Sequence, residues 1–202
     1  YGDAVPANMD PFSTTPYTIN AAAMNANGVA SSYSSNGPSI WISAPGGEYG
    51  VSTPAMITTD QSSCSKGYSQ PASSVNNFEK GLINLNQTCH YTSGFNGTSS
   101  ATPVVSGVIA LMLSANPSLT WRDVKHILAA TSRQIHAAAP DITSQPIAGF
   151  PAIPGGHTWD TGWVTNGAGY KFHNRYGFGL IDADAAVNMA KTYAVNLGTY
   201  AN

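Results

Sequence analysis

Charged side chains are scarce in this sequence. Of its 202 residues, 9% are Asp, Glu, Lys or Arg, and the formal net charge is −2. An average soluble domain carries about 25% of these residues, so polarity here comes from Ser, Thr, Asn, Gly and Tyr. Without a basic excess, nothing favours nucleic acid or an anionic membrane surface as a partner.

Long hydrophobic runs are also missing. A membrane-spanning helix needs about 20 consecutive apolar residues. The longest run here extends from Val104 to Leu113, and it is interrupted by Ser106 and Gly107. It therefore predicts a buried helix, and we expect no membrane partner. A chain of 202 residues is long enough to bury a substantial core, most simply as one domain.

Cysteine is rare, with Cys64 and Cys89 as the two examples. The sequence lacks the CxxC pairs and the clustered Cys and His residues of structural metal sites. We therefore predict a disulfide between Cys64 and Cys89 that closes a surface loop, which indicates an oxidising compartment. The alternative is a pair of buried free thiols.

Hydrophobic runs bounded by turn residues predict three short buried strands, over residues 17–25, 39–46 and 54–60. Residues 61–95 are rich in Ser, Asn and Gly and hold both cysteines. They predict a long loop or an insertion, with a short helix near residues 75–80.

Helical signals follow in the second half of the chain. The first predicted helix covers residues 98–115 and ends before an Asn-Pro pair. The second covers residues 121–131, where Thr120 and Asp123 fit a capping box. The third covers residues 182–195 and opens at an aspartate. Pro and Gly are frequent between the second and third helices, so surface loops are expected there.

Two adjacent serines, Ser99 and Ser100, begin the first of these helices within "GTSSATP", residues 97–103. A serine hydroxyl becomes a nucleophile when a base lies beside it and donors stabilise the oxyanion. The first turn of a helix supplies free N–H groups and the positive end of the dipole. Adjacent helical residues point about 100° apart, so the two serines cannot face the same substrate, and spacing alone does not choose between them. The alternative is a small-residue helix start that packs tightly against a sheet.

The stretch "GTSSATPVVSGVIALML" resembles the nucleophile block of the subtilisin-like serine proteases, a Gly-Thr-Ser-x-Ala-x-Pro pattern followed by a buried helix. This resemblance selects Ser99 as the nucleophile and leaves Ser100 in the variable position. Three further segments, "PYTINAAA", "NPSLTWRDV" and "YGFGLIDA", resemble the kexin/furin branch of that family. The resemblance implies an α/β fold, a three-layer sandwich with a mostly parallel sheet between helices, in which residues 61–95 are an insertion.

The catalytic triad of that family runs Asp, His, Ser along the chain. No histidine precedes His90, which lies in the unmatched loop. We therefore expect residues 1–202 to be the C-terminal part of a catalytic domain, inactive alone, with Asp and His supplied by a missing N-terminal part. That part is removed by cleavage, carried on another chain or omitted. Four histidines follow the serine, and no catalytic role is expected for them: His126, His136, His157 and His173.

The resemblance also implies a substrate pocket. In the kexin/furin branch an aspartate at the base of this pocket pairs with Arg or Lys of the substrate, because a buried guanidinium must be paired. Asp10 in "NMDPFSTTPYTI" takes that place. Its alternative role is that of a turn aspartate ahead of Pro11. The branch holds a calcium ion nearby, for which Asp3 is the candidate ligand, although Ser35 stands where a glutamate is expected.

These patterns predict a serine endopeptidase that forms an acyl-enzyme on Ser99 and prefers basic residues before the cut. The alternatives are a subtilase of broad or aromatic specificity and a catalytically dead binding module. The expected partners are a peptide or protein substrate, the missing N-terminal part, and an accessory domain or chaperone. Residues 61–95 either shape the substrate cleft or dock such an accessory domain or chaperone. The low charge and the single cysteine pair indicate an exported bacterial protein, secreted or periplasmic.

Overall fold

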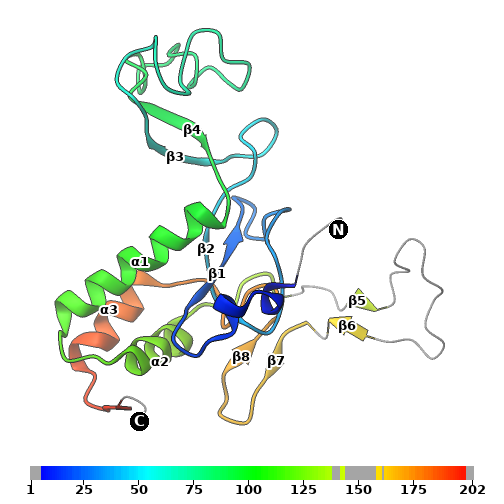
Figure 1. Ribbon diagram of the computed structural model, residues 1–202, viewed down its shortest axis with the longest axis vertical. Coiled ribbons are helices and arrows are strands. Elements are labelled where there is room, and N and C mark those ends of the chain that lie inside the picture. Colours follow the sequence, from blue (N-terminus) through cyan, green and yellow to red (C-terminus); the bar gives the residue numbers. More distant parts are fainter. Residues whose placement is uncertain (1–5, 138–141, 144–157, 161, 199–202) are drawn as a thin grey trace.

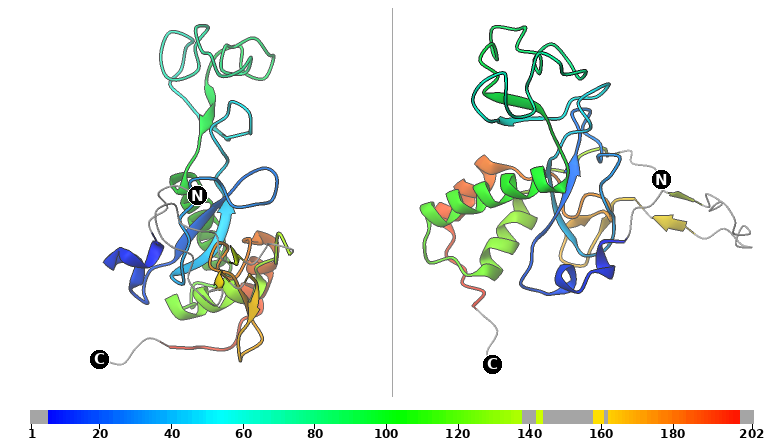
Figure 2. Two further views of the ribbon diagram at one scale, coloured as in Figure 1. Left: turned by 90° about the vertical axis from the view of Figure 1, so that its right-hand side faces the viewer. Right: turned by 45° about the horizontal axis from the view of Figure 1, so that its top comes forward.

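The computed structural model describes residues 6–137, 142–143, 158–160 and 162–198. Three α-helices lie together on one side, a short parallel sheet lies beside them, and a lobe projects away from this body (Figures 1 and 2). The helices are α1 (Thr98–Ala115), α2 (Trp121–Thr131) and α3 (Ala183–Thr192). Two short 3-10 helices, η1 (Ala7–Met9) and η2 (Pro11–Thr14), precede the sheet.

The central sheet pairs β1 (Asn20–Met24) with β2 (Ile40–Pro45) in parallel. Both strands lie within the ranges that the hydrophobic runs predict. A later segment extends the sheet beyond β2, because the Ser43 N–H donates to the carbonyl of Gly179 at 2.8 Å and the Ile181 N–H donates to that of Ser43 at 2.9 Å. The sheet therefore joins the start of the described chain to the segment that leads into α3.

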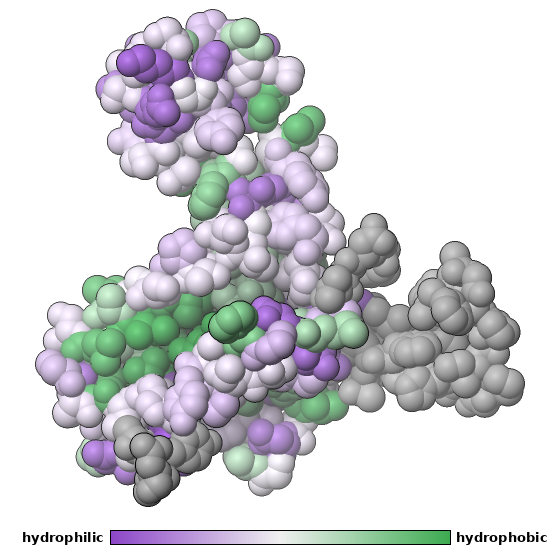
Figure 3. Space-filling model, viewed as in Figure 1, coloured by the Kyte–Doolittle hydropathy of each residue, from purple (hydrophilic) through white to green (hydrophobic). Residues whose placement is uncertain are grey.

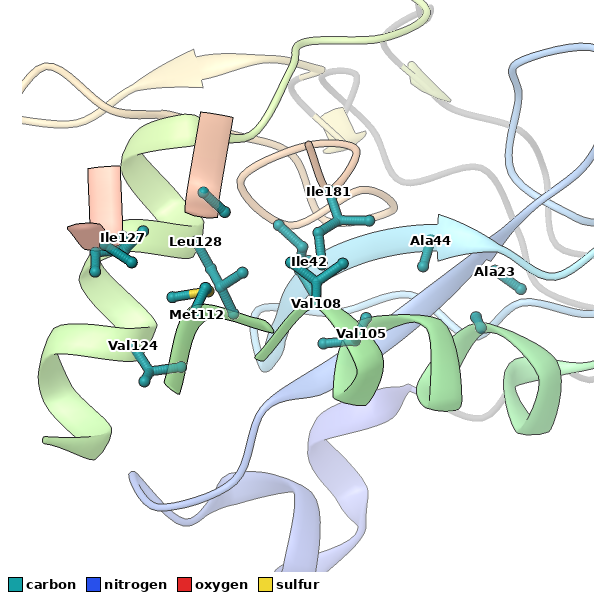
Figure 4. Close-up of a cluster of buried hydrophobic side chains, with 13 residues drawn as sticks. Ala23, Ile42, Ala44, Val105, Val108, Met112, Val124, Ile127, Leu128 and Ile181 are labelled. Carbon is teal, nitrogen blue, oxygen red and sulfur yellow. The ribbon is translucent and has the colours of Figure 1, made fainter. Parts of the chain in front are cut away.

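One hydrophobic core holds this sheet against the helices (Figure 4). Ile42 of β2, Met112 of α1 and Ile127 of α2 are each 0% exposed. Truncating one of these side chains to alanine costs about 2–5 kcal/mol in a typical core. By length and composition α1 also qualifies as a membrane-spanning helix, a test that core helices pass as well. One face of α1 packs against β1, β2 and α3, and 28% of the helix is buried.

The bounds of α1 and α2 agree with the sequence prediction because local signals define them. The Thr120 hydroxyl accepts a hydrogen bond from the Asp123 N–H at 3.3 Å, and the Asp123 carboxylate accepts one from the Thr120 N–H at 2.8 Å, which completes the predicted capping box. Asp182 caps α3 by accepting a hydrogen bond from the Ala185 N–H at 3.0 Å. This helix ends at Thr192, before the predicted end at residue 195.

The lobe consists of residues 60–90 and stands on a two-stranded stalk (Figure 2). The stalk pairs β3 (Met56–Thr59) with β4 (Tyr91–Phe95) in antiparallel fashion. A Cys64–Cys89 disulfide, with an S–S distance of 2.05 Å, closes the lobe. The predicted disulfide is confirmed, and a strand forms at the third predicted position, although it is not buried. Strand β4 lies in the segment that we predicted as a long loop or an insertion.

The helix predicted near residues 75–80 is wrong, since this segment forms turns. The Asn76 side chain accepts a hydrogen bond from the Glu79 N–H at 2.9 Å, as a helix cap does, and the Lys80 N–H donates to the Asn76 carbonyl at 3.2 Å, so one turn forms here. Gly81 then adopts a φ of +69°, a left-handed conformation in which no right-handed helix continues.

Polar side chains fill the interior of the lobe. Asn86 is 1% exposed, and its amide nitrogen lies 2.9 Å from the Ser69 hydroxyl and 2.8 Å from the Tyr91 carbonyl. Its amide oxygen accepts a hydrogen bond from the Tyr91 N–H at 3.1 Å. A unit of this size is too small for a large apolar core. The disulfide and these hydrogen bonds take over the stabilising role.

The segment between α2 and α3, predicted as loops, contains short antiparallel pairs. Strand β5 (Ile142–Thr143) pairs with β6 (Thr158–Asp160), and β7 (Val164–Thr165) pairs with β8 (Lys171–Phe172). The loop prediction is thus incomplete here, because two- and three-residue strands leave no periodic pattern for a sequence reading to detect.

Hydrophobic side chains reach the surface between α1 and α2, on the face shown in Figure 3. On α1, Leu111 is 56% exposed and Leu113 is 39% exposed. Their neighbours Val104 and Ile109 pack partly against the core. This helix therefore carries apolar side chains on more than the face that covers the sheet.

Candidate active site

The two adjacent serines at the start of α1 lie in different surroundings. Ser99 is exposed, whereas Ser100 is 3% exposed and faces the interior. The Ser100 N–H donates to the carbonyl of Gly97 at 2.9 Å, which closes the first turn of the helix. Of the two hydroxyls, therefore, that of Ser99 is available to a molecule in solution.

Gly97 begins α1 as its N-cap, with φ +101° and ψ 171° and without a side chain that could cap the helix. This φ lies in a region that residues with a Cβ atom rarely adopt. A helix without a side-chain cap keeps N–H groups of its first turn free for a ligand, at the positive end of the helix dipole. Pro103 is the sixth residue of α1 and lies beyond the first turn, so its missing N–H leaves the Ser99 carbonyl without the usual donor four residues on. The start of α1 thus offers the free N–H groups that the prediction requires, but it does not supply a base.

A cavity of about 580 Å³ opens beside this helix start. Thr98, the residue before Ser99, forms part of its wall together with Asp10 and Ser35. The structure therefore brings the predicted substrate-binding aspartate to the same cavity as the first turn of α1. The remaining lining residues are Pro6, Ala7, Phe12, Ser13, Thr18, Ile19, Asn20, Ala21, Ile40 and Thr102.

Asp10 is exposed and caps η2. Its carboxylate accepts hydrogen bonds from the Phe12 N–H at 3.0 Å and from the Ser13 hydroxyl at 3.2 Å. The turn role that we considered as the alternative is therefore present, and it coexists with a place on the cavity wall. The same two hydrogen bonds hold the carboxylate in position.

Asn20 and Thr98 form a polar wall of the cavity that the sequence analysis did not identify. The Asn20 side chain donates to the carbonyl of Ser39 at 2.9 Å, which ties β1 to the residue before β2. A polar side chain at the start of an otherwise apolar strand was the available signal.

The predicted calcium ligand Asp3 lies outside the described residues. Ser35 lines the cavity, but its hydroxyl replaces the expected carboxylate, and Ca²⁺ sites rely on carboxylate and carbonyl oxygens. Within the described ranges, no group of three or more His, Cys, Asp or Glu side chains lies together. A weakened calcium site and one rebuilt from carbonyl oxygens both stay open, and the role of Asp3 stays a prediction.

His126 and His136 have side-chain partners other than Ser99, and His90, which precedes the serine in the lobe, is exposed. His126 lies between two tyrosine hydroxyls, with Nδ1 2.7 Å from that of Tyr193 and Nε2 2.8 Å from that of Tyr170. His136 Nδ1 lies 2.9 Å from the Tyr176 hydroxyl, and His173 is 1% exposed. His157 lies outside the described residues. No hydrogen bond among the described residues joins a histidine to Ser99, so this part of the chain offers Ser99 no base.

The family model described as "Subtilase family" matches residues 4–179 of this sequence. The chain belongs to the subtilase family. The extracellular serine protease of Aeromonas sobria is 40% identical over 191 residues, which make up 93% of this chain and 30% of that protein. The human proprotein convertase subtilisin/kexin type 6 is 42% identical over 118 residues, or 57% of this chain and 10% of the convertase.

Solved structures agree with this membership. The crystal structure of the Aeromonas sobria serine protease matches at a TM-score of 0.85 with 38% sequence identity, and the match covers 97% of this chain and 33% of that one. A crystal structure of the same protease in complex with a chaperone matches at a TM-score of 0.85, and the match covers 97% of this chain and 32% of that one. The predicted subtilisin-like α/β fold is therefore confirmed, and this subtilase chain spans about a third of the protease that it matches.

Proposed function

We propose that this subtilase chain is the C-terminal part of a catalytic domain whose complete form hydrolyses peptide bonds through an acyl-enzyme on Ser99. One observation carries the proposal above all. The exposed hydroxyl of Ser99 stands in the uncapped first turn of α1, next to a cavity that also contains Asp10. Family membership supports the chemistry, because subtilases are serine endopeptidases.

The reaction needs groups from outside this chain. In the triad scheme, a histidine takes the proton of the Ser99 hydroxyl while the oxygen attacks the peptide carbonyl, and it later gives that proton to the leaving amine. Water then releases the acyl group from Ser99. An aspartate orients the histidine, and the missing N-terminal part supplies both residues. The first-turn N–H groups of α1 favour the negative charge that develops on the carbonyl oxygen.

The exposed apolar side chains of α1 support the same division. Leu111 and Leu113 are 56% and 39% exposed, and because they are two positions apart on the helix they lie on different faces of it. Burying apolar surface is favourable by about 25 cal/mol per Å², so a further layer of the same domain would gain stability by covering them. We propose that the N-terminal part of the catalytic domain covers exposed apolar side chains of α1.

We further propose that the enzyme belongs with the kexin/furin branch and prefers Arg or Lys before the cut. The place of Asp10 on the cavity wall supports this preference, and so does the similarity to a proprotein convertase. The runner-up is a subtilase of broad or aromatic specificity, which the apolar side chains of Phe12 and Ile19 in the same cavity favour.

Labelling with a fluorophosphonate tests the proposal in the complete protein, which includes the N-terminal part. We expect Ser99→Ala to abolish both labelling and peptide hydrolysis. Ser100→Ala is the matched control, since it removes the neighbouring hydroxyl, which faces the interior; this variant should label and hydrolyse as the parent protein does. A complete protein that does not label would identify a catalytically dead binding module instead.

The partners and location of the complete protein are proposals as well. A crystal structure of the Aeromonas sobria protease includes a chaperone, and we propose an accessory chaperone for this protein, with the lobe as its contact. The relative from that organism is an extracellular protease, which supports export from a bacterial cell. Co-purification of a chaperone with the complete protein, and its loss when the lobe is deleted, would test the assignment.

A further inference from the structure

The hydroxyl of Tyr33 bridges two glycine loops next to the helix that bears Ser99. It accepts a hydrogen bond from the Gly97 N–H at 2.8 Å. On its other side it lies 2.8 Å from the carbonyl oxygen of Gly46 and 2.7 Å from that of Gly47. One hydroxyl thus accepts from the N-cap residue of α1 and donates to the loop that follows β2.

The residues that flank Tyr33 are themselves fixed. Glu48 is 8% exposed, and its carboxylate accepts hydrogen bonds from the N–H and the hydroxyl of Ser32, each at 2.8 Å. On the other side, the Ser34 hydroxyl accepts a hydrogen bond from the Ala23 N–H of β1 at 3.0 Å. Hydrogen bonds on both sides of Tyr33 along the chain therefore hold it in place next to Gly97.

Glu48 remains ionised under ordinary conditions. Burial alone would raise the pKa of its carboxyl group, but the hydrogen bonds from Asn25 and Ser32 lower that pKa below its ordinary value. The carboxylate can thus hold Ser32, and with it Tyr33, throughout the neutral pH range.

Both backbone polar groups of Gly97, its N–H and its carbonyl, form hydrogen bonds. Its carbonyl oxygen accepts the Ser100 N–H within the first turn of α1, while its N–H is bound by Tyr33. The Gly46 loop packs tightly against it, since a Cβ atom on Gly46 would lie 3.0 Å from the Gly97 carbonyl oxygen. With a φ of +101°, Gly97 sets the direction in which the chain enters α1.

We propose that Tyr33 is a positioning residue for Ser99, acting through Gly97. The inference rests on the proposed function of Ser99 as nucleophile. A nucleophile must lie within about 0.5 Å of its productive geometry, and Ser99 follows Gly97 closely at the start of the helix. Without the Tyr33 hydroxyl, the half-buried Gly97 N–H loses its acceptor, and the backbone at the start of α1 becomes more mobile. The substrate cavity, whose walls do not include Tyr33, keeps its affinity.

Tyr33→Phe in the complete protein tests this inference, because it keeps the ring and removes the hydroxyl. We expect kcat to fall about tenfold, as for the loss of one group that holds a catalytic side chain in place. KM should stay within about twofold, because ground-state binding does not use the hydroxyl. Hydrogen exchange of the Gly97 amide, measured by mass spectrometry on the peptide that covers residues 95–101, should become faster.

Tyr49→Phe is the matched control. Tyr49 is 64% exposed, and its ring packs edge-on against that of Tyr33, with 5.8 Å between the ring centroids. The variant therefore keeps the ring contact and removes a tyrosine hydroxyl at the surface. If Tyr33→Phe matches this control in kcat and in amide exchange while the parent protein is active, Tyr33 does not position Ser99. If the parent protein neither reacts with a fluorophosphonate nor cleaves peptides, the proposed function fails, and this inference fails with it.

Discussion

The carboxylate of Glu79, in the lobe, is hydrogen-bonded to Ser93 of β4. One carboxylate oxygen of Glu79 accepts the Ser93 hydroxyl at 3.0 Å and also the Ser93 N–H. The same oxygen accepts the Thr92 hydroxyl at 2.8 Å, and Glu79 is 2% exposed. Since β4 leads directly to Gly97 and Ser99, this carboxylate connects the lobe to the strand that precedes the candidate nucleophile.

Glu79→Ala should therefore destabilise the lobe. The substitution leaves the buried Thr92 hydroxyl and the Ser93 N–H without their acceptor, and each unsatisfied group costs about 1–3 kcal/mol. Limited proteolysis of the lobe, residues 60–90, should become at least tenfold faster. Lys66→Ala, an exposed position in the same lobe, is the control and should cleave at the parent rate. Equal cleavage of both variants would show that Glu79 does not anchor the lobe.

Loss of the disulfide should act on the same unit. Cys64 and Cys89 are separated by 25 residues, and a loop of that length gives a stabilisation of about 3.5 kcal/mol in the chain-entropy description. The double replacement Cys64→Ser, Cys89→Ser should open the lobe to proteases while the helical core, monitored by circular dichroism, stays folded. A simultaneous loss of helix signal would mean that the lobe and the core unfold as one unit.

Local signals explain how much of the fold could be predicted. The end of α1 was predictable from the Asn-Pro pair that follows it, and the start of α2 was predictable from its capping box. Apolar periodicity indicated the helices themselves. β4 was not, because Tyr91–Phe95 contains Thr, Ser and Gly, and its strand conformation depends on pairing with β3. The predicted helix at residues 75–80 does not extend because Gly81 adopts a left-handed φ of +69°, and the sequence does not show which glycines take that conformation.

The candidate site also combines features that the sequence predicts with features that depend on the folded structure. That one of two serines would face outward followed from helix geometry, whereas the burial of Ser100 depends on the packing of α1 against the sheet. The resemblance to subtilases placed Asp10 near the site. Tyr33 could not have been found, because its hydroxyl meets Gly97 across 64 residues of sequence and no local pattern records such a contact.

Acid should weaken the lobe through Asp60. Its carboxylate accepts the N–H groups of Gln61, Tyr68 and Ser69. Burial alone would raise the pKa of Asp60, but these backbone hydrogen bonds lower it below its ordinary value of 3.8. Because the pKa is lower in the folded state, the stabilisation is complete above the ordinary value and is lost as the pH falls through the folded value.

Asp60→Asn should therefore lower the urea midpoint of the lobe at pH 7, and the difference from the parent protein should shrink as the pH falls below about 4. The midpoint can be followed through the fluorescence of a probe attached to the lobe. Asp184→Asn, at an exposed position of α3, is the control and should leave this midpoint unchanged. A difference that is the same at pH 7 and pH 3 would assign the effect of Asp60 to packing and not to its charge.

Asp10→Asn separates the two roles of Asp10 in the complete protein. Asn is about as good a helix cap as Asp, so the amide oxygen can keep the hydrogen bond from the Phe12 N–H while the negative charge is lost. A guanidinium that enters the cavity then has no counter-charge, and an unpaired charge that is desolvated is strongly unfavourable. We expect kcat/KM for chromogenic peptides that end in Arg to fall about 100-fold, whereas peptides that end in Phe should change less than threefold. If both peptides lose activity equally, Asp10 acts through the turn at η2. If neither changes, the preference for basic residues is wrong and the broad or aromatic alternative takes its place.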